Sequence, residues 1–390
     1  MSMADLWPLL TAIAIVMMIV PTIGLYMTFV ERKVAALVQD RLGPNRVGPL
    51  GLFQAIADAI KIMLKEQVTP AQAQKVLFMT APGIGLVASL MAIAVVPFGP
   101  VPTDQPAGVF RFMIAPGVDI GLLFLLAVSS LSAYGIILGG WASNNKYSMY
   151  GAIRSCAQFI SYEVPLGLSI LGIVAYSGTL SIEGIVASQS AGILHWNIWW
   201  QPLAAIIFFT SALAETNRLP FDLPECEQEL VGGFHTEYSG IKFVLFFLAE
   251  YTHVVTVSFL VALLFLGGWH FPGVPSPAVG LTGSAILSML ILVIKVMMVV
   301  FFILMLRWTL PRFRFDQLMG LAWKGLIPLA MANLLGVVIV LSLGGSRWIM
   351  LPVSIALFVA GGYASALSFE RAGRPVPPRP STHLIKQGVA

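Results

Sequence analysis

The stretch that decides the fold spans residues 201–251 and has three parts: QPLAAIIFFTSAL (201–213), AETNRLPFDLPECEQELVGGFHTEYSG (214–240) and IKFVLFFLAEY (241–251). Two apolar segments flank a connection that is rich in carboxylates. Only 10% of the 390 residues are charged, yet a third of the 18 acidic residues lie in this connection: Glu215, Asp222, Glu225, Glu227, Glu229 and Glu237. The pattern predicts two membrane helices joined by an acidic loop that moves protons or couples an anionic intermediate to another process.

The composition of the whole chain is that of a polytopic membrane protein. Apolar residues make up 58% of it, against roughly 45–50% in soluble domains. Because a backbone inside the bilayer must satisfy its own hydrogen bonds, the fold is predicted to be all-α. A span needs about 20 apolar residues. Nine such segments are predicted, at 6–30, 76–97, 117–140, 156–177, 198–214, 241–266, 284–306, 324–343 and 348–368.

The basic residues predict the orientation of the chain. With the N-terminus outside, all but three of the 22 Lys and Arg residues fall on the inner side. Inner loops of membrane proteins are enriched in Lys and Arg, so the N-terminus is predicted outside and the C-terminus inside. The nine tryptophans all lie near predicted segment ends, as interfacial aromatic residues do.

Three regions and one interfacial helix are predicted along the chain. Residues 1–345 form the main membrane domain, 346–369 an additional transmembrane helix, and 370–390 a basic, Pro-rich cytoplasmic tail. Within the first inner loop, LFQAIADAIKIMLKE (52–66) places apolar residues on one helical face and Asp58, Lys61 and Lys65 opposite. This segment is too short and too polar to span, so it is expected to lie in the plane of the membrane surface.

The acidic loop is predicted to be packed rather than solvated. It is rich in apolar and Gly residues, and Pro220 and Pro224 prevent one continuous helix. Glu225 and Glu229 are four residues apart, a spacing at which like charges disfavour a helix. They are expected to be partly protonated, or neutralised by cations of a partner. The alternative is an ordinary acidic loop in solvent.

Ionisable residues inside the predicted membrane segments are costly and are therefore candidates for function. Glu163, followed by Pro165, is interpreted as a proton-relay group or as a structural carboxyl between helices. Glu250 and His253 share a helix face, which suits a proton path or the mutual satisfaction of two buried polar groups. Lys295 should face the protein interior, where it pairs with a carboxylate or loses its proton. One Glu and one His are too few for a metal site.

Four strings together carry a resemblance to a known family. They are ERKVAALVQDRLGPNRVGPLGLFQAIADAIKIMLKE (31–66), ISYEVPLG (160–167), AETNRLPFDLPECEQELVGGFHTEYSGIKFVLFFLAEY (214–251) and RWTLPRFRFDQLMGLAWKGLIPLA (307–330). They resemble the H subunits of the NADH–quinone oxidoreductases, the proton-pumping respiratory complex I. The resemblance covers roughly residues 6–343, in order and with the expected spacing.

The resemblance implies a tunnel that admits a lipid quinone such as ubiquinone. The tunnel-lining residues that match are Arg32, Gln54, Asp58, Phe247, Tyr251 and Arg307. The carboxylates that it assigns to proton coupling are Glu163, Glu215, Asp222, Glu225, Glu227, Glu237 and Glu250. No residue of this chain is expected to act as a redox catalyst or as a metal ligand.

The resemblance also implies partners and a location. The chain is expected to bind no cofactor itself; quinone is the substrate, and NADH, FMN and Fe–S clusters belong to partner subunits. Those partners are hydrophilic Fe–S and quinone-site subunits and antiporter-like membrane subunits, in a bacterial inner membrane, with lipid but no nucleic acid. Two alternatives stay open: the equivalent subunit of a membrane hydrogenase or ferredoxin complex, and a free-standing ion transporter, which would be expected to show an internal repeat.

Overall fold

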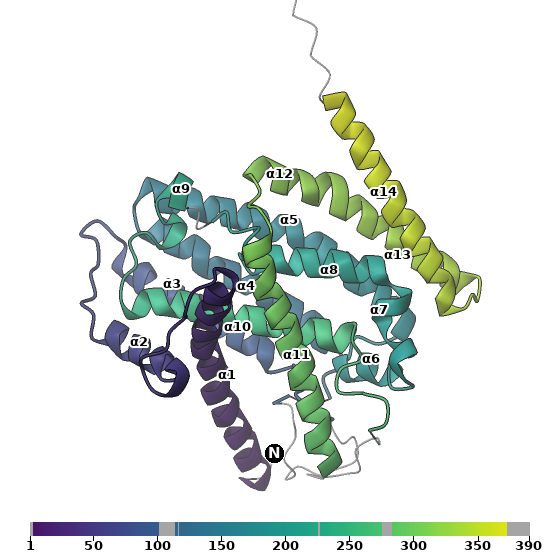
Figure 1. Cartoon of the computed structure of the whole chain (residues 1–390), viewed down its shortest axis with the longest axis horizontal. Coiled ribbons are helices and arrows are strands. Elements are labelled where there is room, and N and C mark those ends of the chain that lie inside the picture. The colour runs from purple at the N-terminus through teal and green to yellow at the C-terminus, as the bar shows by residue number, and fades with distance from the viewer. Residues whose placement is uncertain (1–2, 101–113, 116, 225–226, 275–282, 373–390) are drawn as a thin grey trace, which may run out of the picture.

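The computed structural model describes residues 3–100, 114–115, 117–224, 227–274 and 283–372. All regular secondary structure in these ranges is helical, which confirms the all-α prediction (Figure 1). The tail predicted at 370–390 lies almost entirely outside the described residues, and the three-region division stays a prediction.

Seven helical stretches are long and apolar enough to cross a membrane. They are α1 (Met3–Val38), α3 (Lys75–Ile93), α4 (Gly121–Ala142), α5 (Lys146–Ser177), α10 (Ile241–Leu264), α11 (Gly283–Thr309) and the continuous stretch Phe315–Ser342. That last stretch comprises α12 (Phe315–Gly320), a π-helical segment (Leu321–Leu326) and α13 (Ile327–Ser342). The chain is therefore a multi-pass membrane protein, while its orientation stays a prediction.

Two of the nine predicted spans are shorter apolar helices. Segment 198–214 is divided into α7 (Asn197–Trp200) and α8 (Pro202–Glu215). The break falls at Pro202, which has no N–H to donate and so suits a first helical position better than a helix interior. The last predicted segment corresponds to α14 (Met350–Ala372), whose apolar part Arg347–Tyr363 is also short.

Two helices extend beyond their predicted ends toward the same side of the molecule. α1 continues eight residues past residue 30, through the charged Glu31–Lys33 stretch. α5 begins ten residues before residue 156, where the Asn145 side chain accepts a hydrogen bond from the Tyr147 backbone N–H and caps the helix. Hydropathy alone placed these ends at the limits of the apolar runs, and both helices continue into polar sequence.

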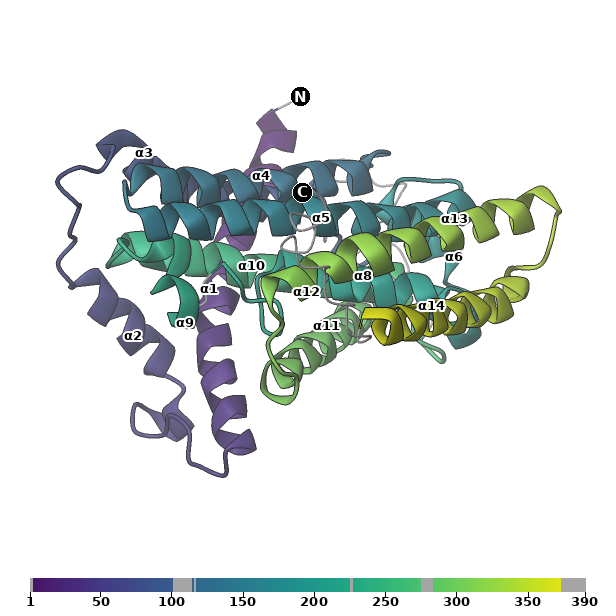
Figure 2. The ribbon, with the colours of Figure 1, turned by 90° about the horizontal axis from the view of Figure 1, so that it is seen from above.

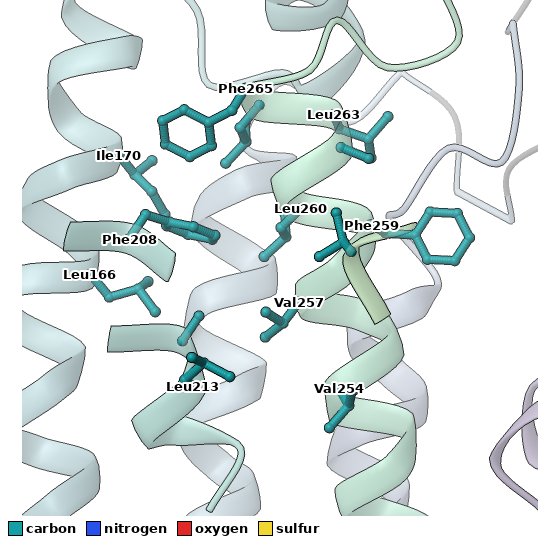
Figure 3. Packing of buried hydrophobic residues seen from close by; sticks show 14 of the residues in the cluster. Leu166, Ile170, Phe208, Leu213, Val254, Val257, Phe259, Leu260, Leu263 and Phe265 are labelled. Carbon is teal, nitrogen blue, oxygen red and sulfur yellow. The ribbon is translucent and has the colours of Figure 1, made fainter. Parts of the chain in front are cut away.

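The core lies around α10. Figure 3 shows Phe208 and Leu213 of α8 lying between Ile170 of α5 and the Val257–Leu260 side of α10. On the other sides α10 contacts α1, α3 and α11. α14 packs against α13 at the edge of the bundle (Figure 1). The arrangement fixes the inner half of α10 beside the acidic loop.

α2 (Gln54–Met63) stands apart from the bundle and diverges from α1 (Figure 2). Ala55 is buried toward the protein, whereas the apolar face is exposed, from Phe53 at 52% to Leu64 at 82%. The predicted amphipathic helix is therefore confirmed, with its apolar face turned outward. Such a face is typical of a helix lying at a membrane surface. Two further short helices, α6 (Ile182–Ser188) and α9 (Glu227–Leu230), lie in connections.

Candidate functional site

A cavity of about 900 Å³ lies where α1, α2, α10, the inner end of α11 and the acidic loop meet. Of the six residues predicted to line a tunnel, five line this cavity: Arg32, Asp58, Phe247, Tyr251 and Arg307. The sixth, Gln54, adjoins it, since its Nε2 donates to Asp58 Oδ1 at 2.9 Å. Residues more than 200 positions apart in the sequence are thus brought to one cavity.

An ion pair ties α2 to α1 across the cavity wall. Arg32 Nη1 lies 2.5 Å from Asp58 Oδ2, and the Arg32 side chain is about half exposed. An exposed pair of this kind contributes little to stability, about 0.2–1 kcal/mol. Its role is to position α2, whose other links to the bundle are few.

A buried carboxylate, Glu31, organises the opposite wall. Its side chain accepts a hydrogen bond from Tyr251 Oη at 2.6 Å and lies 3.3 Å from Arg218 Nη1. Arg307 forms a further ion pair with Glu31, and the Arg218 guanidinium lies over the Tyr251 ring, 4.2 Å from its centroid. Two arginines share one carboxylate, so this wall carries a net positive charge. The sequence interpretation did not select Glu31 as a site residue.

The acidic loop is packed, as predicted. Phe221 and Leu223 are buried, and Gln158 of α5 donates 2.8 Å hydrogen bonds to the carbonyls of Ala214 and Phe221. Asp222 pairs with Arg312 at 2.8 Å. The described part of the loop is therefore held by both its apolar and its polar side chains.

A second, much smaller cavity of about 30 Å³ lies next to the first. Glu215, Glu250 and His253 all line it, and His253 Nε2 is 3.5 Å from Glu215 Oε1. The predicted Glu250–His253 pair is thus part of a group of three. A volume of about 10–15 Å³ is enough for one water molecule. Glu250 also lines the large cavity and so connects the two.

The remaining predicted carboxylates lie farther along the same side. Glu163 accepts a hydrogen bond from Ser130 of α4 and lines neither cavity. Glu237 accepts from Asn145 Nδ2 at 2.7 Å. Glu225 lies outside the described residues, and of Glu227 only the backbone, at the start of α9, is described. Glu229 pairs with Arg154 at 2.5 Å, so its neutralising cation belongs to this chain rather than to a partner.

The tyrosine next to Glu237 is one of the fixed points of the loop. Tyr238 stacks on Phe78 and donates a 3.3 Å hydrogen bond to the Gly139 carbonyl. Burial raises the pKa of the Tyr238 phenol above its ordinary value, while its hydrogen bond with Ser143 opposes the rise. The phenol therefore keeps its proton and acts as a structural donor.

Lys295 does not pair with a carboxylate, contrary to expectation. Its Nζ donates to three backbone carbonyls beyond the end of α10, those of Leu266 at 2.7 Å, Gly268 at 2.8 Å and His270 at 2.9 Å. It also lies 4.3 Å from the centroid of the Trp196 ring. Burial and the charge of Lys295 both lower the pKa of the His270 imidazole. Lys295 thus satisfies carbonyls that a helix end leaves without donors.

No group of three or more His, Cys, Asp or Glu side chains in the described part of the chain is placed to hold a metal ion. The polar groups of the large cavity are guanidinium, carboxylate, phenol and amide groups. They can donate and accept hydrogen bonds and hold charge beside a ligand, in a space within the range of about 300–1,000 Å³ that is usual for small-molecule sites.

Comparisons with known proteins agree with the geometry. Residues 10–338 match the family model described as NADH dehydrogenase. The NADH-quinone oxidoreductase H subunit of Protochlamydia amoebophila is 48% identical over 315 residues, which cover 80% of this chain and 91% of the relative. An H subunit of the same kind of complex in Geobacter metallireducens, the one numbered 1, is 46% identical over 329 residues, covering 84% and 94%.

A third relative extends the match toward the C-terminus. NADH-quinone oxidoreductase subunit 8 of Rhodothermus marinus is 43% identical over 348 residues, which cover 87% of this chain and 97% of the relative. Identity at this level over most of both chains carries the fold and the membrane role together. The chain therefore belongs to the family of NADH-quinone oxidoreductase H subunits and is a membrane subunit of that complex.

Proposed function

We propose that this chain forms the quinone-access tunnel of its complex and couples quinone reduction to proton translocation. The observation that carries the proposal is the cavity of about 900 Å³ lined by Arg32, Asp58, Phe247, Tyr251 and Arg307. NADH, FMN and Fe–S chemistry belong to partner subunits in this proposal, ubiquinone is the substrate, and the complex resides in a bacterial inner membrane. The name shared by the relatives favours this function over a hydrogenase-type complex or a free-standing transporter.

The walls of the cavity suit a molecule with a polar head and an apolar tail. Phe243, Phe247 and Trp308 supply aromatic surface, and the Glu31 group and the Arg32–Asp58 pair supply charge. A quinone carries two carbonyl oxygens, which can accept hydrogen bonds from guanidinium groups, on an apolar ring with an isoprenoid tail. Direct donors and apolar surface thus occur in one space.

The charge changes of quinone reduction supply a means of coupling. Reduction takes two electrons and two protons, so negative charge appears near the headgroup before protonation is complete. At 4 Å and an effective dielectric constant of about 20, such a charge acts on a carboxylate with about 4 kcal/mol. That corresponds to roughly three pKa units, which is enough to move a proton.

The described carboxylates suggest a route for that proton. Glu250 lines the large cavity and also the small one that holds Glu215 and His253. From there the proposed route continues toward Glu163, whose hydrogen bond with Ser130 links α4 and α5. Glu225, Glu227 and Glu237 are proposed to take part through the acidic loop, whose packing against α5 places it beneath the cavity.

A photoreactive quinone analogue should label this chain within 31–66 and 241–251. Both segments contribute walls to the large cavity. In the intact complex, Phe247→Ala should lower the labelling several-fold because it removes aromatic surface from the wall. Phe358→Ala, an exposed position on α14, serves as the control and should leave the labelling unchanged. Mass spectrometry of the labelled peptides is the measurement, and labels confined to partner subunits would contradict the tunnel.

Replacing Glu225 and Glu227 together by glutamine should lower the number of protons pumped per electron while quinone reduction continues. The change removes two titratable groups from the acidic loop but keeps side-chain size. Proton uptake by vesicles, compared with NADH oxidation in the same sample, measures the ratio. Glu66→Gln, an exposed position elsewhere on the same side, is the control. An unchanged ratio in the assembled double variant would show that the loop does not couple the two processes.

A further inference from the structure

We propose that the polar face of α2 binds the headgroup of an anionic phospholipid. A separate cavity of about 360 Å³ lies between α2 and the start of α10. Its charged lining residues are Arg32, Asp58, Lys61 and Lys65, and Tyr238 and Phe243 form the facing wall. Neither lysine belongs to the large cavity, so the proposed quinone function leaves both without a role.

The lining carries an excess of positive charge. Arg32 is compensated by Asp58 at 2.5 Å, whereas no ion pair of Lys61 or Lys65 occurs among the described residues. The two lysines are four positions apart on one helix and therefore project from the same face. Two like charges at this spacing repel each other, and an anion between them relieves the repulsion. A phosphate oxygen is the acceptor that such ammonium donors bind most strongly.

The opposite face of the same helix indicates that the anion is a lipid. Phe53, Ile56, Ile60 and Met63 lie along it, and each is between 42% and 67% exposed. Apolar side chains in such a row favour the acyl-chain boundary of a membrane. A helix that presents one apolar face and one cationic face at that boundary matches the two ends of a phospholipid. Basic pockets beside membrane helices bind anionic headgroups for the same reason.

The lipid site adjoins the large cavity without being part of it. The two cavities share Arg32, Asp58, Ile62 and Phe243. The lipid headgroup would therefore sit next to the wall that α2 contributes to the proposed tunnel. Binding of the lipid is measurable without quinone and without turnover, so this inference and the proposed function can fail separately.

The test uses the assembled complex in detergent with two photoreactive lipids that have identical chains, a phosphatidylglycerol and a phosphatidylcholine. Phosphatidylglycerol should label peptides from 54–66 and 238–243 several-fold more than phosphatidylcholine does. A double variant, Lys61→Gln with Lys65→Gln, should lose roughly twentyfold of that labelling, because each lysine near an anionic lipid contributes about fivefold in affinity. Both positions are exposed, so the fold should be unaffected.

The matched control is Lys33→Gln with Lys75→Gln, which removes the same charge outside the cavity and should leave the labelling unchanged. Three results would overturn the proposal. One is equal labelling by the two lipids, and another is full labelling of the Lys61/Lys65 variant. The third is complete competition by millimolar inorganic phosphate, which would identify a site for a free anion rather than for a lipid.

Discussion

Replacing Glu31 by glutamine should remove most of the quinone-dependent activity of the assembled complex and lower its thermal stability. Glu31 is 6% exposed and is the shared partner of Arg218, Arg307 and Tyr251. Removing one partner from a buried ion pair costs about 3–5 kcal/mol, because the remaining charge is left without compensation. Here two guanidinium groups would lose their counter-charge at once, and the Tyr251 hydroxyl would lose the acceptor that orients it.

A double-mutant cycle separates the pair from its surroundings. Arg218→Gln should destabilise the complex by itself, and Glu31→Gln with Arg218→Gln should cost less than the sum of the two single changes. Groups in direct contact typically show such coupling energies, at about 0.5–3 kcal/mol. The measurement is the thermal midpoint of the purified complex, read beside NADH oxidation with a water-soluble acceptor that reports on the partner subunits. Additive effects would mean that the two side chains do not interact.

Glu66→Gln is the matched control, since Glu66 is exposed on the same inner side of the chain. It should leave both the midpoint and the activity unchanged. Normal quinone reduction in Glu31→Gln would show that this carboxylate does not organise the cavity wall.

The importance of Glu31 was not predictable from the sequence. Its partners Arg218 and Tyr251 are 187 and 220 positions away. No local pattern reports contacts over that distance, and a Glu beside an Arg at a predicted helix end is usually a surface feature. The useful signal is a carboxylate in a helix that continues beyond its apolar run, as α1 does, because packing then decides whether the side chain is solvated.

Local patterns succeeded where one element determines the result. The spacing of apolar residues in 52–66 predicted α2 correctly, because alternate faces of a single helix are fixed by its period. The Pro, Gly and apolar content of the acidic loop likewise predicted its burial. Quantities that depend on packing between elements were beyond that kind of reasoning, including the break before Pro202, which interrupts an apolar run long enough to be predicted as one span.

The five cavity-lining residues were found by resemblance rather than by physics. Arg32 and Asp58 lie in one local stretch, and Phe247 and Tyr251 share a face of α10. Only Arg307 comes from a distant helix, and nothing in its own surroundings in the sequence points to α1. The fold brings it there by packing α11 against α1 and α10.

Lys295→Met should prevent most of the complex from assembling, rather than merely stopping proton movement. The lysine serves three carbonyls, and each buried acceptor left without a donor costs about 1–3 kcal/mol. The total, on the order of several kcal/mol, approaches the whole stability of a typical protein, about 5–15 kcal/mol. Methionine fills a similar volume, so the loss would come from the missing donors.

The outcome distinguishes a structural lysine from a proton relay. Lys324→Met, which removes an exposed lysine that lines none of these cavities, is the control and should assemble normally. Blue-native gels of membranes measure how much complete complex accumulates, and vesicle assays measure protons per electron in whatever assembles. A structural cap predicts little complex in Lys295→Met, and a normal ratio in the remainder. Full assembly with a lowered ratio would instead identify Lys295 as a group that carries protons. Arginine keeps the charge and the donors, so Lys295→Arg should recover part of the assembly if the carbonyls are what the side chain serves.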